Sequence, residues 1–317
     1  MSVTSCLACW HARVSARTHA GYGANFRSML DRTPFDRVLV VHTGKGGAKK
    51  TSLVTHLAGI VAEAGYRVLL VDLDRQGNCG EDLGYTALAD DGAGLRRSIE
   101  TGSALVPTLT ARTNLQVVAG GPQLRDLKLP AGTNPFDALV PCLSPVASEY
   151  DMVLLDTPPG GSATIDMALG VARFLIIPSP PDRSSIKGLS FVAESVDEAR
   201  VHNPQLVLLG TVLVEVPTSA TRIRAEAMEG LEKSLGDPSL LFRTSVRSAL
   251  KTAEAGRRHG LLAHELAAKL DDGRPFWDFL RSGQKVPDRA QSAPGLASDY
   301  VAITDEVLQR IHEEESR

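Results

Sequence analysis

The sequence predicts an α/β fold in which a mostly parallel, twisted sheet is flanked by helices. Short apolar runs alternate with longer stretches of helical periodicity over most of the 317 residues, and this alternation is typical of βαβ units. A glycine-rich loop joins the first apolar run to the first helical stretch, and carboxylates follow two later runs. Ligands bind at the carboxyl ends of the strands in such sheets, so these features predict a site at that edge.

The predicted elements follow one another along a single domain, residues 36–315. Residues 1–35 are expected to be a poorly ordered N-terminal extension, because arginines and glycines interrupt any apolar period there. Proline and glycine predict loops between 103 and 135 and a connector between 283 and 295. We expect strands near 37–43, 67–72, 114–119, 151–156, 173–178, 206–215 and 240–246, and helices near 51–64, 92–101, 135–148, 162–170, 185–202, 221–235, 247–258 and 296–314.

The composition is that of a soluble globular protein. Apolar residues make up 43% of the chain and charged residues 22%, with a formal net charge of −3. No apolar run reaches the roughly 18 residues that a membrane helix needs, so we expect a cytoplasmic protein without a membrane partner. Four scattered cysteines agree with a reducing compartment.

A predicted phosphate-binding loop follows the apolar run Val38–Val41 and precedes a helical stretch that begins near Thr51. Such a loop aims backbone N–H groups and the positive end of a helix dipole at one small volume, which suits a nucleotide phosphate. Gly44, Lys50 and Thr51 match the usual pattern G-x-x-x-x-G-K-S/T, whereas Lys49 stands where the second glycine belongs. An ordinary glycine-rich turn is the alternative. The expected nucleotide-binding residues are Gly44, Lys45, Gly46, Gly47, Ala48, Lys49, Lys50, Thr51 and Ser52.

Two further apolar runs end in carboxylates. Val68–Asp72 is followed by Asp74, and another run ends at Asp156. Because the carboxyl ends of parallel strands meet at one edge, we expect Asp74 and Asp156 to converge on the tip of Lys50. A single Asp after a strand is usually a cap or turn residue, but three such strand ends in one chain, the first followed by the phosphate-binding loop, are harder to assign to capping.

The same residues resemble the motifs of the ParA/MinD ATPases. The segment from Lys45 to Thr51 is similar to their deviant Walker A box K-G-G-x-G-K-S/T, whose additional early lysine corresponds to Lys45. Residues 72–78, Asp-Leu-Asp-Arg-Gln-Gly-Asn, resemble the D-x-D-P-Q-G-N segment of ParA proteins, with Arg75 in place of proline. The strand that ends at Asp156 resembles the family's Walker B strand. The resemblance covers residues 36–315 in order.

The resemblance implies a P-loop NTPase fold of the deviant Walker A type and an ATPase that uses ATP and Mg²⁺. Lys50 would contact the β- and γ-phosphates, and Thr51 would hold Mg²⁺ with Asp156 near its water shell. Asp74 would orient the attacking water. In this family the lysine at the position of Lys45 crosses to the partner's phosphates, which implies a homodimer in the ATP state. The implied catalytic residues are therefore Lys45, Asp74 and Lys50.

A partitioning function also follows from the resemblance. It implies an ATPase that binds DNA non-specifically, associates with the nucleoid, and positions a plasmid, chromosome or other cargo with a ParB-like adaptor. Residues 221–260 carry eight Lys or Arg against five Asp or Glu. Arg247 and Lys251 are four apart, so on a helix they share a face, and Arg243 lies just before them. These three form the expected DNA-binding stripe, with an ordinary solvated helix surface as the alternative.

Lys49 and Arg75 depart from the family pattern. Glycine precedes the P-loop lysine because the backbone must turn tightly while it presents an N–H to phosphate. A side chain at Lys49 is therefore expected to strain or crowd the loop, and we expect slow ATP hydrolysis. A nucleotide-binding regulator with weak hydrolysis is the corresponding alternative.

Other functions stay open from the sequence. A MinD-like ATPase at a membrane surface would need a basic amphipathic C-terminal helix, whereas residues 307–315 end in three glutamates, which anionic lipid repels. An ATP-dependent reductase or iron–sulfur carrier would need Cys79 and Cys142 to pair across a dimer, but neither lies in a matching motif. A zinc site, without an apparent fourth ligand, is suggested by Cys6, Cys9 and His11.

Overall fold

The computed structural model describes residues 33–109, 112–218, 221–270 and 292–316. Its strands are β1 (Val38–Val41), β2 (Val68–Asp72), β3 (Thr108–Leu109), β4 (Leu115–Val118), β5 (Met152–Asp156), β6 (Phe174–Ser179), β7 (Val207–Val216) and β8 (Leu241–Arg247). Its helices are α2 (Lys50–Glu63), α3 (Cys79–Leu83), α4 (Ala93–Thr101), α5 (Val140–Ala147), α6 (Ala163–Val171), α7 (Arg183–His202), α8 (Thr221–Leu235), α9 (Leu250–His259), α10 (Ala263–Leu270) and α12 (Ala293–Glu315).

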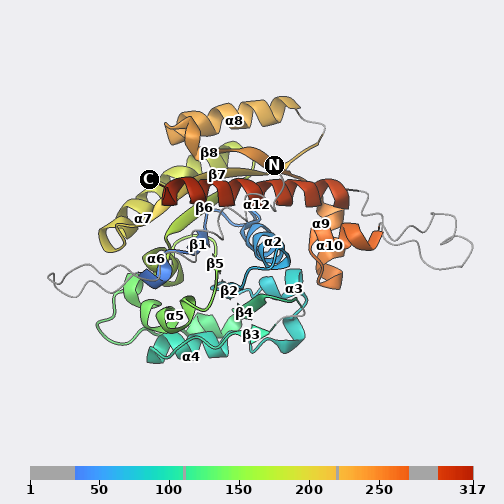
Figure 1. Cartoon of the computed structure of the whole chain (residues 1–317). Helices are drawn as coiled ribbons and strands as arrows, with labels where there is room; N and C mark the ends of the chain where they lie inside the picture. The colour runs from blue at the N-terminus through green and yellow to red at the C-terminus, as the bar shows by residue number, and fades with distance from the viewer. Residues whose placement is uncertain (1–32, 110–111, 219–220, 271–291, 317) are drawn as a thin grey trace, which may run out of the picture.

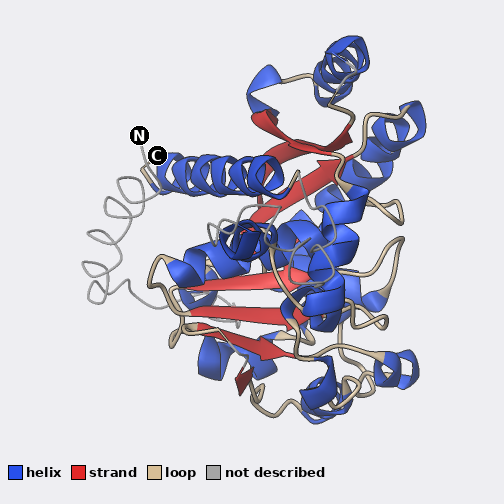
Figure 2. Cartoon of the chain, turned by 90° about the vertical axis from the view of Figure 1, so that its right-hand side faces the viewer, coloured by secondary structure: helices blue, strands red, loops and turns tan. Residues whose placement is uncertain are grey.

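The strands form one sheet in the order β3-β4-β2-β5-β1-β6-β7-β8. Every neighbouring pair is parallel except β3 with β4, which is antiparallel at the edge. Helices lie on both faces of the sheet (Figure 1, Figure 2). The predicted α/β fold with a mostly parallel sheet is therefore confirmed.

Alternate residues of each central strand enter two separate cores. In β1, Val38 and Val40 pack with residues of α4, α5, α6, α7 and α8 on one face. Leu39 and Val41 pack with residues of α2, α3, α10 and α12 on the other. Because both faces are covered, the strands read as continuous apolar runs, as parallel strands commonly do. The carboxyl ends of β1, β2 and β5 lie side by side, since β5 pairs with both of the others.

The expected strands are all present, and the differences concern short elements and helix starts. Strand β3 and helices α3 and α10 are too short to show a clear period in the sequence. Helix α5 begins at Val140 rather than at 135, because a 3₁₀ turn at Pro135–Asp137 comes first and Pro141 fits only the first turn of a helix. Helix α9 begins at Leu250, three residues later than expected.

The N-terminal boundary also differs slightly. Phe35 is 3% exposed and packs in the core with Val38, so the packed part of the chain begins before residue 36. The cysteine–histidine cluster Cys6, Cys9 and His11 lies outside the described residues. Among the described helices, none is long and apolar enough to cross a membrane.

Candidate nucleotide-binding site

The loop between β1 and α2 has the shape of an anion-binding turn. Gly44, Gly46 and Gly47 are exposed, and Gly47 has a φ of 78°. Helix α2 starts at Lys50 and has no side-chain cap at its N-terminus. Its first backbone N–H groups therefore lack helical partners and lie beside the loop, where an anion would satisfy them. The predicted strand–loop–helix arrangement is confirmed.

The side chain of Lys50, the first residue of α2, reaches back to this loop. Only 6% of the residue is exposed, and its Nζ lies 3.4 Å from the backbone oxygen of Lys45. Burial lowers the pKa of Lys50, and the charges of Asp156 and Asp74 oppose that shift. Both carboxylates thus act on the Lys50 ammonium, Asp156 as the last residue of β5 and Asp74 from just beyond β2.

Thr51 and Asp156 form the oxygen-rich part of the site. The Thr51 hydroxyl donates to Asp156 Oδ2 over 2.7 Å. Asp156 is fully buried, and its Oδ1 has no hydrogen-bond partner in the described part of the chain. Burial raises the pKa of Asp156 to about 7, against the Thr51 hydrogen bond and the Lys50 charge. Hydroxyl and carboxylate oxygens suit Mg²⁺, so these residues fit the ion, which would neutralise phosphate charge when bound.

Asp74 is held in a fixed position just beyond β2. It is 5% exposed, its backbone N–H donates to Asp72 Oδ1 over 2.9 Å, and its own Oδ1 accepts from the Gln76 N–H at 2.9 Å. A carboxylate fixed in this way could orient a water molecule next to the Lys50 ammonium. Asp74 therefore lies close enough to Lys50 for its charge to act on the ammonium.

Lys45 points away from the loop, toward the N-terminus of α7. Its Nζ donates to both oxygens of Asp182, at 2.9 and 3.0 Å, and to the hydroxyls of Ser184 and Ser185 at 2.8 and 3.2 Å. Burial alone would raise the pKa of Asp182, but the Ser184, Ser185 and Lys45 hydrogen bonds outweigh it and lower the pKa. The Lys45 side chain is 43% exposed, so it is held at the surface.

Lys49 adopts the backbone conformation that glycine usually supplies. Its φ is 56° and its ψ is 28°, in the left-handed region, which costs a residue with a Cβ about 1–2 kcal/mol. Its Nζ lies 3.4 Å from the carboxylate of Glu215 near the end of β7. The expected strain is thus present in the backbone, because Lys49 is in the left-handed conformation. Its side chain points away from the loop and forms an ion pair with Glu215.

The three expected DNA-binding residues do not share a helix face. Arg247 is the last residue of β8, where it pairs with Val216, so the prediction that it lies on a helix with Lys251 is wrong. The strand continues to Arg247 because Asp299 accepts from its backbone N–H at 2.9 Å and from its guanidinium at 2.6 and 2.8 Å. Arg243, also on β8, and Lys251, on α9, are exposed.

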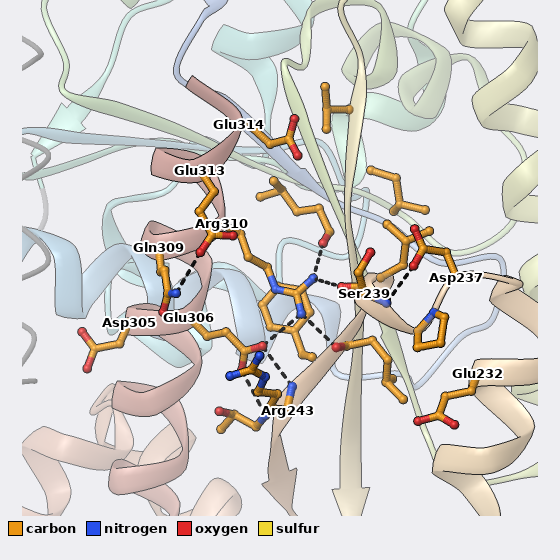
Figure 3. A pocket seen from close by; sticks show the side chains of 18 of the residues that line it. Glu232, Asp237, Ser239, Arg243, Asp305, Glu306, Gln309, Arg310, Glu313 and Glu314 are labelled. Atoms are coloured by element: carbon orange, nitrogen blue, oxygen red, sulfur yellow. Dashed lines mark hydrogen bonds and ion pairs between the residues drawn. The ribbon is translucent and has the colours of Figure 1, made fainter. Parts of the chain in front are cut away.

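A cavity of about 890 Å³ lies elsewhere, beside the edge strand β8 and helices α8 and α12 (Figure 3). Six carboxylates and three arginines line it, Arg243 among them. Arg310 donates to the backbone oxygens of Leu209, Ser239 and Leu241 and lies 4.0 Å above the Phe242 ring. The Arg310 guanidinium is thus occupied by the protein's own backbone oxygens. The other lining residues make the cavity too acidic for a nucleotide phosphate.

Three residues near the loop were missed from the sequence. His42 Nδ1 lies 3.1 Å from the Thr157 hydroxyl, and burial, with the Lys50 charge, lowers its pKa to about 4. Its position directly after a strand was the only local signal. The other two, Asp182 and Glu215, contact loop residues from distant segments, so nothing local marked them.

Comparisons with known proteins agree with this geometry. Residues 36–208 match the AAA domain family. The chromosome partitioning protein ParA of Myxococcus xanthus is 34% identical over 191 residues, which span 56% of this chain and 64% of that protein. Protein IncC of Escherichia coli is 30% identical over 291 residues, spanning 86% of this chain and 71% of IncC.

Solved structures share the fold. The ATP complex of McdA from Cyanothece has a TM-score of 0.68 at 18% identity, over 86% of this chain and 96% of that one. The family match covers more than half of the chain. The chain therefore belongs to the AAA domain family and is a ParA-type P-loop ATPase.

Proposed function

We propose that this ATPase partitions or positions a cargo by switching between nucleotide states, with ATP and Mg²⁺ bound at the β1–α2 loop. The observation that carries the proposal is the Thr51–Asp156 contact of 2.7 Å beside the buried Lys50 ammonium. Phosphoryl transfer needs charge neutralisation and positioning more than covalent help. Lys50 supplies a cation for the β- and γ-phosphates, Thr51 and Asp156 hold the metal, and Asp74 orients the attacking water.

The ATP state is proposed to be a homodimer. Lys45 is not used inside its own loop, since its ammonium lies on Asp182 at the start of α7. Its side chain is 43% exposed, so it is accessible to the γ-phosphate of a second copy. Binding of Lys45 to that phosphate requires release of Asp182, which couples dimerisation to nucleotide. Hydrolysis removes the γ-phosphate contact and loosens the dimer.

Non-specific DNA is the proposed surface on which the dimer acts, and a ParB-like adaptor links it to cargo, as the sequence resemblance implies. Lys251 and Arg243 are exposed and, within the described residues, show no ion pair, so their charges are available to phosphates. Arg247 contributes less, because Asp299 neutralises its guanidinium. Because acidic residues lie near Arg243 (Figure 3), we expect Lys251 to contribute more than Arg243 to the binding of DNA phosphates.

The test is sedimentation with long DNA of mixed sequence, without nucleotide, with ADP and with ATP. Wild type should sediment with DNA only with ATP, and Lys50→Ala should neither bind ATP in calorimetry nor sediment with DNA. Arg243→Glu with Lys251→Glu should keep ATP-dependent dimers and lose DNA. Lys233→Glu is the control, because Lys233 is an exposed lysine paired with Glu229 on α8.

Salt dependence gives a quantitative check. Each phosphate contact contributes about −0.9 to the slope of log K against log salt. Loss of two contacts per chain, four per dimer, should flatten the slope by roughly 3 to 4. Unchanged DNA binding in the double variant would move the DNA surface elsewhere, and unchanged ATP affinity in Lys50→Ala would refute the nucleotide site.

The alternatives receive less support. A membrane-surface ATPase would need a basic C-terminal helix, whereas α12 ends in Glu313, Glu314 and Glu315. Flotation of wild type with anionic liposomes, without DNA binding, would favour that alternative. For the iron–sulfur alternative, Cys79 and Cys142 are both fully buried and lie in different cores, on opposite faces of the sheet. They could not both meet a partner's cysteines without unfolding.

A further inference from the structure

We propose that Phe191 anchors the interface through which two copies of this chain associate in the ATP state. Phe191 lies in the middle of α7, and 68% of the residue is exposed. Burial of an aromatic ring against a partner is favourable, and aromatic residues carry much of the binding energy of protein interfaces. The inference rests on the proposed function, because the homodimer at Lys45 supplies the second copy.

Phe191 lies on the same side of α7 as the residue that contacts Lys45. Residues four and seven apart share one side of a helix, so Ser184, Gly188 and Phe191 follow one another along α7. The Ser184 hydroxyl lies 2.8 Å from Lys45 Nζ. A Cβ on Gly44, where the phosphate-binding loop begins, would lie 3.9 Å from the Gly188 backbone oxygen. This part of α7 is therefore beside the loop, and a second copy that reaches Lys45 also approaches it.

The area that a stable dimer buries is large enough to include Phe191. Phe191 is seven residues beyond Ser184, which corresponds to about 10 Å along the helix axis. A standard interface covers roughly 800 Å² of each partner, and a round patch of that area has a radius of about 16 Å. A patch of this size around the Lys45 ammonium therefore extends over the Phe191 ring.

The two serine hydroxyls on this side of α7 already have partners within the chain. The Ser184 hydroxyl donates to Asp182 Oδ1, and the Ser195 hydroxyl, one turn beyond Phe191, donates to the Phe191 backbone oxygen at 3.0 Å. Polar groups that keep their hydrogen bonds can be buried at little cost. A Cβ added to Gly188 would meet no atom within 4 Å, so the surface next to the ring has room for a side chain of the second copy.

The experiment measures the dimer dissociation constant by sedimentation velocity, with Mg²⁺ and the slowly hydrolysed analogue ATPγS. A two-fold dimer contains the Phe191 ring twice, so Phe191→Ser should weaken the dimer by about 30-fold or more, the effect of losing a hot-spot side chain. Phe191→Leu, which keeps an apolar group, should weaken it less. Both variants should bind ADP in calorimetry with the affinity of wild type, because every residue of the phosphate-binding loop is retained.

Val201→Ser is the matched control. Val201 is on the same helix and is 77% exposed, but it lies seventeen residues beyond Ser184, or about 25 Å along the axis. It is therefore outside the patch around Lys45, and its substitution should leave the dimer dissociation constant unchanged. Because Phe191 and Val201 are both exposed, both serine variants should fold, and urea unfolding verifies this.

Lys45→Ala separates this inference from the proposed function. If Lys45→Ala loses the dimer while Phe191→Ser keeps the affinity of wild type, the ring lies outside the interface and only the inference fails. Equal weakening by Phe191→Ser and Val201→Ser would also overturn the inference, because the effect would not belong to one side of α7. A wild-type chain that stays monomeric with ATPγS would overturn the proposed homodimer and the inference together.

Discussion

Substitutions at position 49 provide a test, because the glycine variant should be more stable than the alanine variant, which reverses the usual order in a helix. Lys49 is left-handed, with φ 56°, and this conformation costs about 1–2 kcal/mol for any residue with a Cβ. Its ion pair with Glu215, in which both side chains are 29% exposed, contributes at most about 1 kcal/mol. Lys49→Ala removes the pair and keeps the penalty, whereas Lys49→Gly removes both.

The expected magnitudes follow from these terms. Lys49→Ala should destabilise the protein by about 0–1 kcal/mol, the value of the pair. Glycine avoids the left-handed penalty but loses about 0.5–1 kcal/mol to the freedom of the unfolded chain. Lys49→Gly should therefore be more stable than Lys49→Ala by roughly 0.5–1 kcal/mol. At an ordinary helical position alanine is instead more stable than glycine by about 1 kcal/mol.

Urea unfolding of the two variants measures the order directly. Ala64→Gly is the matched control, because Ala64 follows the last residue of the same helix with a φ of −70°. It should lose up to about 1 kcal/mol. If Lys49→Ala were as stable as Lys49→Gly or more so, the left-handed conformation of Lys49 would be wrong.

Turnover gives an independent measurement on the same variant. If the lysine strains the loop most in the transition state, Lys49→Gly should raise ATP hydrolysis, and relief of about 1.4 kcal/mol would appear as a tenfold gain. Unchanged or slower hydrolysis would mean that the strain is equal in all states, or that Lys49 itself contacts phosphate.

Three further predictions concern the site and its support. Asp74→Ala should leave ATP bound and trap a long-lived dimer in size-exclusion chromatography, whereas loss of ATP binding would make Asp74 a structural residue. Asp182→Asn should release Lys45 and favour ATP-dependent dimers by up to about fivefold, the limit for a pair this exposed, and Asp151→Asn, which breaks an exposed pair far from the loop, should not. Burial lowers the pKa of His56 to about 4, so on acidification the unfolded chain protonates at His56 before the folded protein does. The stability that neutral His56 contributes to the folded state is therefore complete above pH 6.5 and is lost as the pH falls toward 4. The stability gap between wild type and His56→Gln should narrow by roughly 3 kcal/mol over that range, and a constant gap in urea unfolding would contradict the assignment.

Local patterns in the sequence were sufficient for the framework of the fold. Strands buried on both faces have to be continuous apolar runs, and their alternation with helical periods allows little besides a parallel sheet. The loop between β1 and α2 could be located because glycines and the Lys50–Thr51 pair lie within a few residues of each other. Asp74 and Asp156 followed from the rule that parallel strands end at one edge.

Only the tertiary structure determined which side chains meet. Lys45 contacts Asp182, which is 137 residues away, and Lys49, which follows β1, contacts Glu215 of β7, a strand two places away across the sheet. Arg247 belongs to a strand rather than a helix because Asp299 of α12 binds its backbone and its guanidinium. Propensity and periodicity act over a few neighbouring residues, whereas these contacts depend on how distant elements pack, and that is why the sequence alone could not assign them.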